Sequence, residues 1–190
     1  MTKFGLIRHG ETDWNTEGRA QGQSDIALND TGRLQAHTLA ERLRNESWDV
    51  IFSSDLSRAK ETADIVAKLM GLTVLTDSRL REMYKGEMEG TTLKERIQKW
   101  GEQWERLAPG LESEDSIVSR GTSFIAEAAE TYKGKNILVF SHGVLIGSTL
   151  KHFIPSIDTK VHIVNTSVTT ITRSGSKWEC ELFNCSKHVV

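Results

Sequence analysis

Two short segments of the sequence hold the residue types that could carry out chemistry. Residues 8–12 (Arg-His-Gly-Glu-Thr) follow a mostly apolar run at 4–7, and residues 141–143 (Ser-His-Gly) follow an apolar run at 136–140. In both places an imidazole comes directly after a segment typical of a buried strand. An uncharged imidazole can attack phosphorus, and the guanidinium of arginine binds phosphate oxygens. The two segments therefore indicate phosphoryl chemistry, with His9 as the candidate nucleophile.

The rest of the chain predicts strands that alternate with helices. Strands are expected at 4–7, 49–53, 72–75 and 136–140, and two closing strands near 161–171 and 178–183. Helices are expected from Thr31, as an N-cap, through Leu43, then over 59–66, 91–107, 125–132 and 144–153, with a loop at 108–116. This alternation predicts an α/β fold with a mostly parallel sheet flanked by helices.

The predicted sheet decides where the two histidines should lie. Ligands of parallel sheets bind beyond the carboxyl ends of the strands, and His9 and His142 both follow such ends. If the two strands are neighbours, both imidazoles face one crevice. Gly143 then opens a helix whose N-terminus would favour an anion. Nearby arginines would attract phosphate and keep the nucleophile unprotonated.

Composition limits the classes of function that remain. The chain has 190 residues, 37% of them hydrophobic, which suits a single domain spanning 1–190. Its 24 basic and 26 acidic side chains give a formal charge of −2, which argues against a nucleic-acid binder or an anionic-membrane binder. Cys180 and Cys185 are too few for a disulfide framework or a zinc site. With no signal-peptide pattern and no apolar run of about 18 residues, we expect a cytoplasmic location.

Four motifs, in a fixed order, resemble those of the histidine phosphatase superfamily, the phosphoglycerate-mutase-like group. The first is Arg8-His9-Gly10 after a strand, continued by Asn15 and by the stretches 19–25 and 28–36. The second is 53–63, which contains Arg58, the third is 82–90, and the fourth is 141–143. The resemblance covers about residues 4–147 and implies a three-layer α/β sandwich.

The resemblance also implies a role for each matching residue. His9 would become phosphohistidine, and Glu82 would protonate the leaving oxygen and then activate water. The phosphate would be bound by Arg8, Asn15, Gln21, Arg58, His142 and Gly143. No metal and no other cofactor is required, and no dense set of carboxylate or histidine ligands is visible in the sequence.

The sequence departs from the family pattern near the expected acid. Lys85 stands where an aromatic residue is common, and 144–147 (Val-Leu-Ile-Gly) lacks an arginine often found after the second histidine. Glu87 and Glu89 lie close to Glu82 and remain rival acids. We expect these departures to change substrate fit more than chemistry.

The segment after Gly90 bears on the type of reaction. The resemblance implies that mutase members have a longer segment there, with basic residues that bind the substrate. This chain instead has a short helical excursion around 83–116, with no adjacent arginine pair. Aromatic and methionine side chains in the excursion suggest a partly apolar pocket: Met83, Tyr84, Met88, Trp100 and Trp104. For the two tryptophans, packing on one helix is the alternative interpretation.

We therefore expect a phosphatase of broad specificity that acts on small phosphorylated metabolites. Two alternatives remain open: a phosphoglycerate mutase-type phosphotransferase, and a non-catalytic protein that binds a phosphorylated ligand. The sequence identifies neither the physiological substrate nor the oligomeric state.

Overall fold

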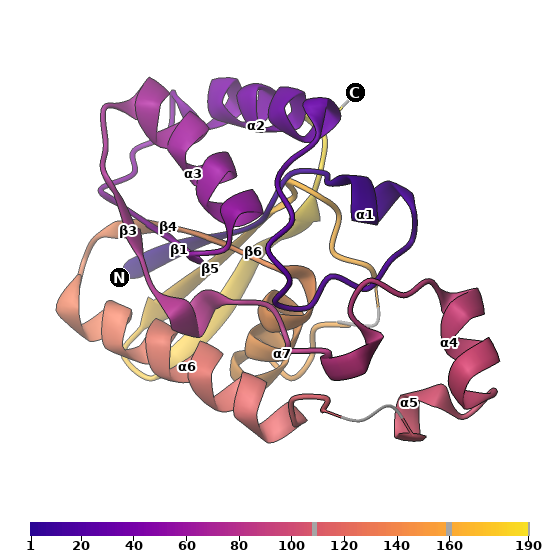
Figure 1. Cartoon of the computed structure of the whole chain (residues 1–190). Helices are drawn as coiled ribbons and strands as arrows, with labels where there is room; N and C mark the ends of the chain where they lie inside the picture. The colour runs from indigo at the N-terminus through magenta and orange to yellow at the C-terminus, as the bar shows by residue number, and fades with distance from the viewer. Residues whose placement is uncertain (108–109, 159–160, 190) are drawn as a thin grey trace.

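A six-stranded mixed sheet forms the centre of the computed structural model, which describes residues 1–107, 110–158 and 161–189 (Figure 1). The strands are β1 (Thr2–Arg8), β2 (Val50–Ser53), β3 (Val74–Thr76), β4 (Asn136–Ser141), β5 (Val168–Ser174) and β6 (Lys177–Cys185). Their order in the sheet is β3-β2-β4-β1-β5-β6. The first four are parallel, while β5 is antiparallel to β1 and β6 is antiparallel to β5.

Helices cover both faces of this sheet (Figure 1). They are α1 (Asp13–Thr16), α2 (Asp30–Leu43), α3 (Ser57–Met70), α4 (Leu93–Trp100), α5 (Trp104–Leu107), α6 (Glu114–Thr131) and α7 (Gly143–Phe153), with 3-10 turns at Ser78–Leu80 and Gly86–Met88. Helices α2 and α3 lie on one face, and α6 and α7 lie on the other. The predicted α/β fold with flanking helices is confirmed.

Each face has its own hydrophobic core. On one face, Phe4 and Leu6 of β1 join a cluster with Phe124 of α6 and Leu145 of α7. On the other face, Ile7 packs in a cluster that includes the apolar stripes of α2 and α3. Each large aliphatic side chain buried in this way contributes about 1.5–3 kcal/mol relative to exposure. The cores therefore hold β1 and β4 rigidly between two layers of helices.

The neighbouring positions of β1 and β4 confirm the central structural prediction. The strands pair in parallel, with Arg8 opposite Ser141 at their carboxyl ends. The His9 backbone N–H continues the ladder by donating to the Ser141 carbonyl at 3.0 Å. The two histidine segments therefore leave the sheet at the same edge.

Two predicted helix ends were wrong because local capping was misjudged. The N-cap of α2 is Asn29 and not Thr31, since the Asn29 side chain accepts from the Gly32 N–H at 2.8 Å. Helix α6 begins at Glu114 and is capped by Ser113. Residues 114–116 of the loop expected at 108–116 are therefore helical. Residues 108–109 of that loop lie outside the described residues.

The expected helix over 91–107 is two helices, and the first closing strand is shorter than predicted. Helix α4 ends at Trp100 and is followed by Gly101, whose φ of 76° is open to glycine but strained for other residues. Trp100 and Trp104 therefore do not share a helix face: they stack with Lys99 and Arg96 respectively. The strand expected near 161–171 begins only at Val168. None of the helices in the described part of the chain is long and apolar enough to span a membrane.

Candidate active site

The imidazoles of His9 and His142 face each other at the carboxyl ends of β1 and β4. Their ring centroids are 5.1 Å apart with an interplanar angle of 57°. Both side chains are buried, with 2% and 0% of their surfaces exposed. The structure thus brings together two residues that are more than a hundred positions apart in the chain.

The hydrogen bonds of His9 select one tautomer. Its Nδ1 lies 2.6 Å from the Gly10 carbonyl oxygen, which can only accept, so Nδ1 carries the proton. On the other side of the ring, Nε2 accepts from the Arg58 Nε–H at 3.3 Å. The lone pair of Nε2 is therefore the nucleophilic position of this imidazole.

Arg58 is a completely buried cation at the start of α3. Besides its contact with His9, the guanidinium donates to the carbonyls of Ser24 and Gly22, each at 2.8 Å. Gly22 has a φ of +53°, and a side chain there would collide with the Glu89 carboxylate. Burial lowers the pKa of Arg58 to about 10, which leaves it charged at neutral pH. The loop around Gly22 therefore directs backbone carbonyls, and not carboxylates, at the Arg58 guanidinium.

Arg8, the last residue of β1, places a second guanidinium beside the histidines. One terminal nitrogen donates to the Ile163 carbonyl at 2.6 Å and lies 2.8 Å from His162 Nε2. Within the described residues, its buried Nε has no hydrogen-bond partner. A β-carbon at Gly143 would lie 3.7 Å from that Nε, so Gly143 leaves the nitrogen open. Burial lowers the pKa of Arg8, against the opposing effect of Glu82.

Burial and the two arginines keep both histidines neutral. The pKa of His9 falls well below its usual 6.5 through burial, then through the charges of Arg58 and Arg8. The pKa of His142 is lowered in the same direction by burial first and Arg58 second. An imidazole must be unprotonated to act as a nucleophile, and this environment holds His9 in the neutral form that such a role requires.

His142 is oriented by a residue that the sequence analysis did not single out. Its Nε2 lies 2.9 Å from the Ser54 hydroxyl, which follows β2. Its buried Nδ1 has no partner among the described residues. Ser54 lies within the motif at 53–63, so its position in that motif was the signal that could have found it.

Glu82 lies at the N-terminus of α7. Its carboxylate accepts from the backbone N–H groups of Val144 and Leu145, each at 3.2 Å, and from that of Met83 at 2.9 Å. Its charge acts on both Arg8 and Arg58, raising the pKa of each against the effect of burial. Glu82 is therefore the carboxylate that shares the site with the two arginines.

The rival acids have other partners. Glu89 accepts from the backbone N–H groups of Gln23, Ser24 and Lys85 and from the Ser24 hydroxyl. It thus closes the loop that aims carbonyls at Arg58. Glu87 pairs with Lys99 at 2.8 Å on the surface, where its side chain is 55% exposed.

Of the two remaining candidates, Asn15 lies in helix α1 and Gln21 lies in the loop that follows it. Asn15 forms a capping box with Thr12 and accepts from Asn165 at 3.3 Å, while Asn165 also donates to the His9 carbonyl. Gln21 is buried, and its side-chain oxygen has no partner within the described residues. Asn165 had no recognised motif around it in the sequence analysis.

A cavity of about 540 Å³ adjoins Arg8 and Glu82. Its wall is formed by Gly143, Val144, Gly147 and Ser148 of α7, and charged groups around it include Lys85, Glu114 and Lys151. None of the side chains expected to form a partly apolar pocket (Met83, Tyr84, Met88, Trp100 and Trp104) lines it. Met88 is instead buried. The cavity is partly apolar all the same, because Val118, Val144, Val161 and Ile163 line it.

Comparison with known families agrees with this geometry. The model of the histidine phosphatase superfamily (branch 1) matches residues 4–186. The chain belongs to this superfamily. One relative, the uncharacterised phosphatase PhoE of Bacillus subtilis (strain 168), is 32% identical over 192 residues, covering 100% of this chain and 97% of the relative.

Other members of the superfamily match over nearly the same length. The phosphoglycerate mutase-like protein 4 of Arabidopsis thaliana is 37% identical over 196 residues, covering 97% of this chain and 85% of the relative. A solved structure of an Entamoeba histolytica phosphoserine phosphatase mutant in complex with phosphoserine has a TM-score of 0.86 and 28% identity, covering all of both chains.

This histidine phosphatase is an enzyme, so the non-catalytic alternative drawn from the sequence is set aside. Among the residues that the structure describes, no group of three His, Cys, Asp or Glu side chains is arranged to hold a metal ion.

Proposed function

We propose that this enzyme hydrolyses small organic phosphate monoesters through a phosphohistidine intermediate on His9. The observation that carries the proposal is a set of buried polar atoms around the two facing histidines, one of which contacts His9 Nε2. Arg58 Nε donates to this nitrogen, while Arg8 Nε and His142 Nδ1 have no partner within the described residues. Three such groups around one nucleophile suit the equatorial oxygens of a phosphoryl group.

In the first step, the His9 Nε2 lone pair forms a bond to phosphorus as the bond from phosphorus to the substrate oxygen breaks. The electron pair of the broken bond goes to the leaving oxygen, which takes a proton from Glu82. An attraction between unit charges 4 Å apart is about 4 kcal/mol at an effective dielectric near 20, so the arginines contribute strongly to the transition state. The products are phosphohistidine and an alcohol.

In the second step, water replaces the alcohol. Glu82, now ionised, takes a proton from the water as its oxygen attacks phosphorus and the bond to His9 Nε2 breaks. Inorganic phosphate leaves, and the neutral imidazole and the protonated Glu82 are restored. Asn15 of α1 and Gln21 of the following loop are proposed as further phosphate contacts.

The cavity beside Glu82 is the proposed site of the alcohol part of the substrate. It adjoins the carboxyl that would protonate the leaving oxygen, and its volume of about 540 Å³ admits a small metabolite. Lys85 and Lys151 provide ammonium groups in its lining, and Glu114 provides a carboxylate. This mixture suits polar alcohols of several kinds and supports broad specificity.

A mutase-type phosphotransferase remains the second candidate, because one relative is named a phosphoglycerate mutase-like protein. In that case the phosphoryl group would pass from His9 to an acceptor faster than to water. The short pair of helices α4 and α5 after Gly90 supports hydrolysis instead, since a wetter site favours attack by water.

The test is turnover of p-nitrophenyl phosphate in the presence of EDTA, with phosphohistidine trapped by rapid acid-free quenching. We expect metal-independent release of inorganic phosphate, and loss of both turnover and trapped phosphoenzyme in His9→Ala. Full dependence on added metal, or unchanged turnover in His9→Ala, would overturn the proposal. Release of phosphate slower than transfer to added 2-phosphoglycerate or 3-phosphoglycerate would favour the mutase.

A further inference from the structure

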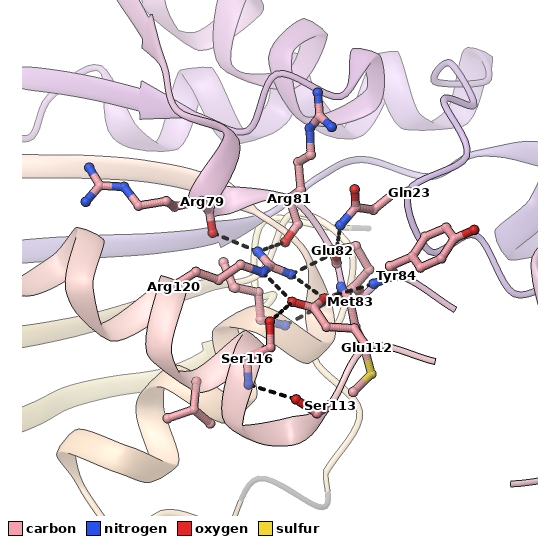
Figure 2. Close-up of polar contacts among 12 residues, drawn as sticks. Gln23, Arg79, Arg81, Glu82, Met83, Tyr84, Glu112, Ser113, Ser116 and Arg120 are labelled. Atoms are coloured by element: carbon pink, nitrogen blue, oxygen red, sulfur yellow. Dashed lines mark hydrogen bonds and ion pairs between the residues drawn. The ribbon is translucent and has the colours of Figure 1, made fainter. Parts of the chain in front are cut away.

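Arg120 of α6 lies beneath the backbone that carries Glu82 (Figure 2). One terminal nitrogen of its guanidinium donates to the carbonyl of Arg79 at 2.7 Å and also to that of Arg81. The other terminal nitrogen donates to the carbonyl of Glu82 itself at 2.9 Å. Three carbonyls within four residues therefore converge on one side chain.

Glu112 completes this arrangement from the residues just before α6. Its carboxylate receives two hydrogen bonds from the Arg120 guanidinium, at 2.8 Å and 3.0 Å. Its second oxygen also accepts from the Tyr84 N–H at 3.0 Å, and its own backbone N–H donates to the Tyr84 carbonyl at 2.9 Å. Arg120 thus holds the chain up to and including Glu82, and Glu112 holds it two residues later.

Both side chains are nearly enclosed, so water competes little for these hydrogen bonds. The Arg120 side chain is 16% exposed and the Glu112 side chain 12%. Burial alone would raise the pKa of Glu112, but hydrogen bonds from Arg120, Tyr84 and Ser116 lower it, so the carboxylate stays charged. A planar guanidinium can satisfy a carboxylate and several carbonyls at once, which a lysine ammonium cannot do with the same geometry.

We propose that Arg120, locked by Glu112, is a positioning residue that sets the Glu82 carboxyl at the leaving oxygen. The inference rests on the proposed function, because it needs Glu82 as the acid and base. Arg120 touches no substrate in this scheme and acts through the backbone of 79–82, while its charge also helps to lower the pKa of His142. Misplacement of an acid by about 1 Å can cost about 100-fold in rate, so a backbone clamp of this kind governs catalysis.

The test uses substrates that differ in their need for an acid. A 2,4-dinitrophenolate leaves without a proton, whereas a phenolate or an alkoxide needs one. We expect Arg120→Met to lower kcat/KM about tenfold or more for phenyl phosphate and glycerol phosphate, and to change it less than about twofold for 2,4-dinitrophenyl phosphate. Because Glu82 also activates water, kcat for 2,4-dinitrophenyl phosphate should fall together with KM.

Three further variants separate positioning from charge and from general loss of structure. Arg120→Lys keeps the positive charge but not the planar guanidinium with its several N–H donors, and should recover less than half of the lost kcat/KM. Glu112→Gln should give the same substrate pattern as Arg120→Met, with a smaller effect, and provides the test if Arg120→Met does not fold. Arg173→Met removes another arginine–glutamate pair, between Arg173 of β5 and Glu130 of α6 at 2.7 Å, and should leave the substrate pattern unchanged.

Glu82→Gln distinguishes failure of this inference from failure of the proposed function. If Glu82→Gln lowers kcat/KM equally for all three substrates, the assignment of Glu82 as the acid is wrong. If Glu82→Gln shows the leaving-group pattern but Arg120→Met and Glu112→Gln lower all substrates equally or none, the positioning role is wrong and the proposed function stands. When both are right, adding Arg120→Met to Glu82→Gln should lower kcat/KM for phenyl phosphate less than about twofold further.

Discussion

Arg58 and Arg120 are both arginines with little or no exposure, yet their surroundings differ in one respect. Arg120 is paired with the Glu112 carboxylate at 2.8 Å, so its charge is locally neutralised. The hydrogen bonds of Arg58 go to two backbone carbonyls and to His9, and none of those that the structure describes goes to a carboxylate. A buried cation without a carboxylate partner is costly in the free protein and attracts an anion. The comparison supports a ligand-binding role for the arginine without a carboxylate partner and a backbone-holding role for the paired one.

The first prediction, and the largest expected effect, tests this contrast on activity. Arg58→Met should lower kcat/KM about 100- to 1000-fold for every substrate, 2,4-dinitrophenyl phosphate included. The reason is that Arg58 stabilises charge on the phosphoryl oxygens, which develops whatever the leaving group is. Steady-state kinetics across the substrate series checks this. A loss confined to poor leaving groups would show that Arg58 and Arg120 do not differ in the way described.

The second prediction concerns stability, measured by urea unfolding without phosphate at pH 7.5, 6.5 and 5.5. His9 and His142 bind a proton near pH 6.5 in the unfolded chain but only at lower pH in the folded one, since their folded pKa values are depressed. The unfolded state therefore gains protons first, and stability falls as pH drops below 6.5. Each histidine should cost about 1.4 kcal/mol per pH unit until its folded pKa is reached.

Controls for the pH series come from the histidine pair and from the Arg120–Glu112 pair. His142→Asn should reduce the fall of stability with pH below 6.5 by the contribution of one histidine. Part of the fall remains because burial and Arg42 also lower the pKa of His188, to about 4. Arg120→Met should lower stability already at pH 7.5, because it leaves the nearly enclosed Glu112 carboxylate without its guanidinium partner. An unchanged slope in His142→Asn would contradict the neutral state assigned to that ring.

The third and smallest effect is expected at His162, which contacts Arg8 through Nε2 at 2.8 Å. Burial and the charge of Arg8 lower the pKa of His162, so at neutral pH it accepts a hydrogen bond from the guanidinium. His162→Phe should remove that acceptor and lower kcat/KM about fivefold, equally for good and poor leaving groups. His162→Gln, which keeps an acceptor, should lose less. A loss limited to phenyl phosphate would place His162 with Glu82 and not with Arg8.

Local patterns were sufficient for most of the fold and for the principal residues of the site. The apolar runs before His9 and His142 predicted β1 and β4, because a strand buried on both faces is a continuous run of apolar residues. Helix ends were less reliable. The break of α4 at Gly101 and the cap of α2 at Asn29 depend on a single turn and one side-chain hydrogen bond, which periodicity does not contain.

The supporting contacts could not be predicted in the same way. Three of these contacts join residues far apart in the chain. Arg120 is 38 positions from Glu82, Ser54 is 88 positions from His142, and His162 is 154 positions from Arg8. Nothing in the neighbouring sequence of each residue marks such a partner. Lys85 and the stretch 144–147 depart from the family pattern, but only the structure shows that Lys85, Val144 and Gly147 line one cavity beside Glu82.

By itself, the sequence determined that an arginine and two histidines end buried strands and that a helix N-terminus follows the second histidine. These are local facts, encoded by the order of apolar and polar residues along a few turns of chain. The tertiary structure decided which arginine meets a carboxylate and which meets only carbonyls. That choice depends on loops and helices that pack together from distant parts of the chain, and it supports the roles proposed for one cation at the phosphoryl group and for the other at the backbone of Glu82.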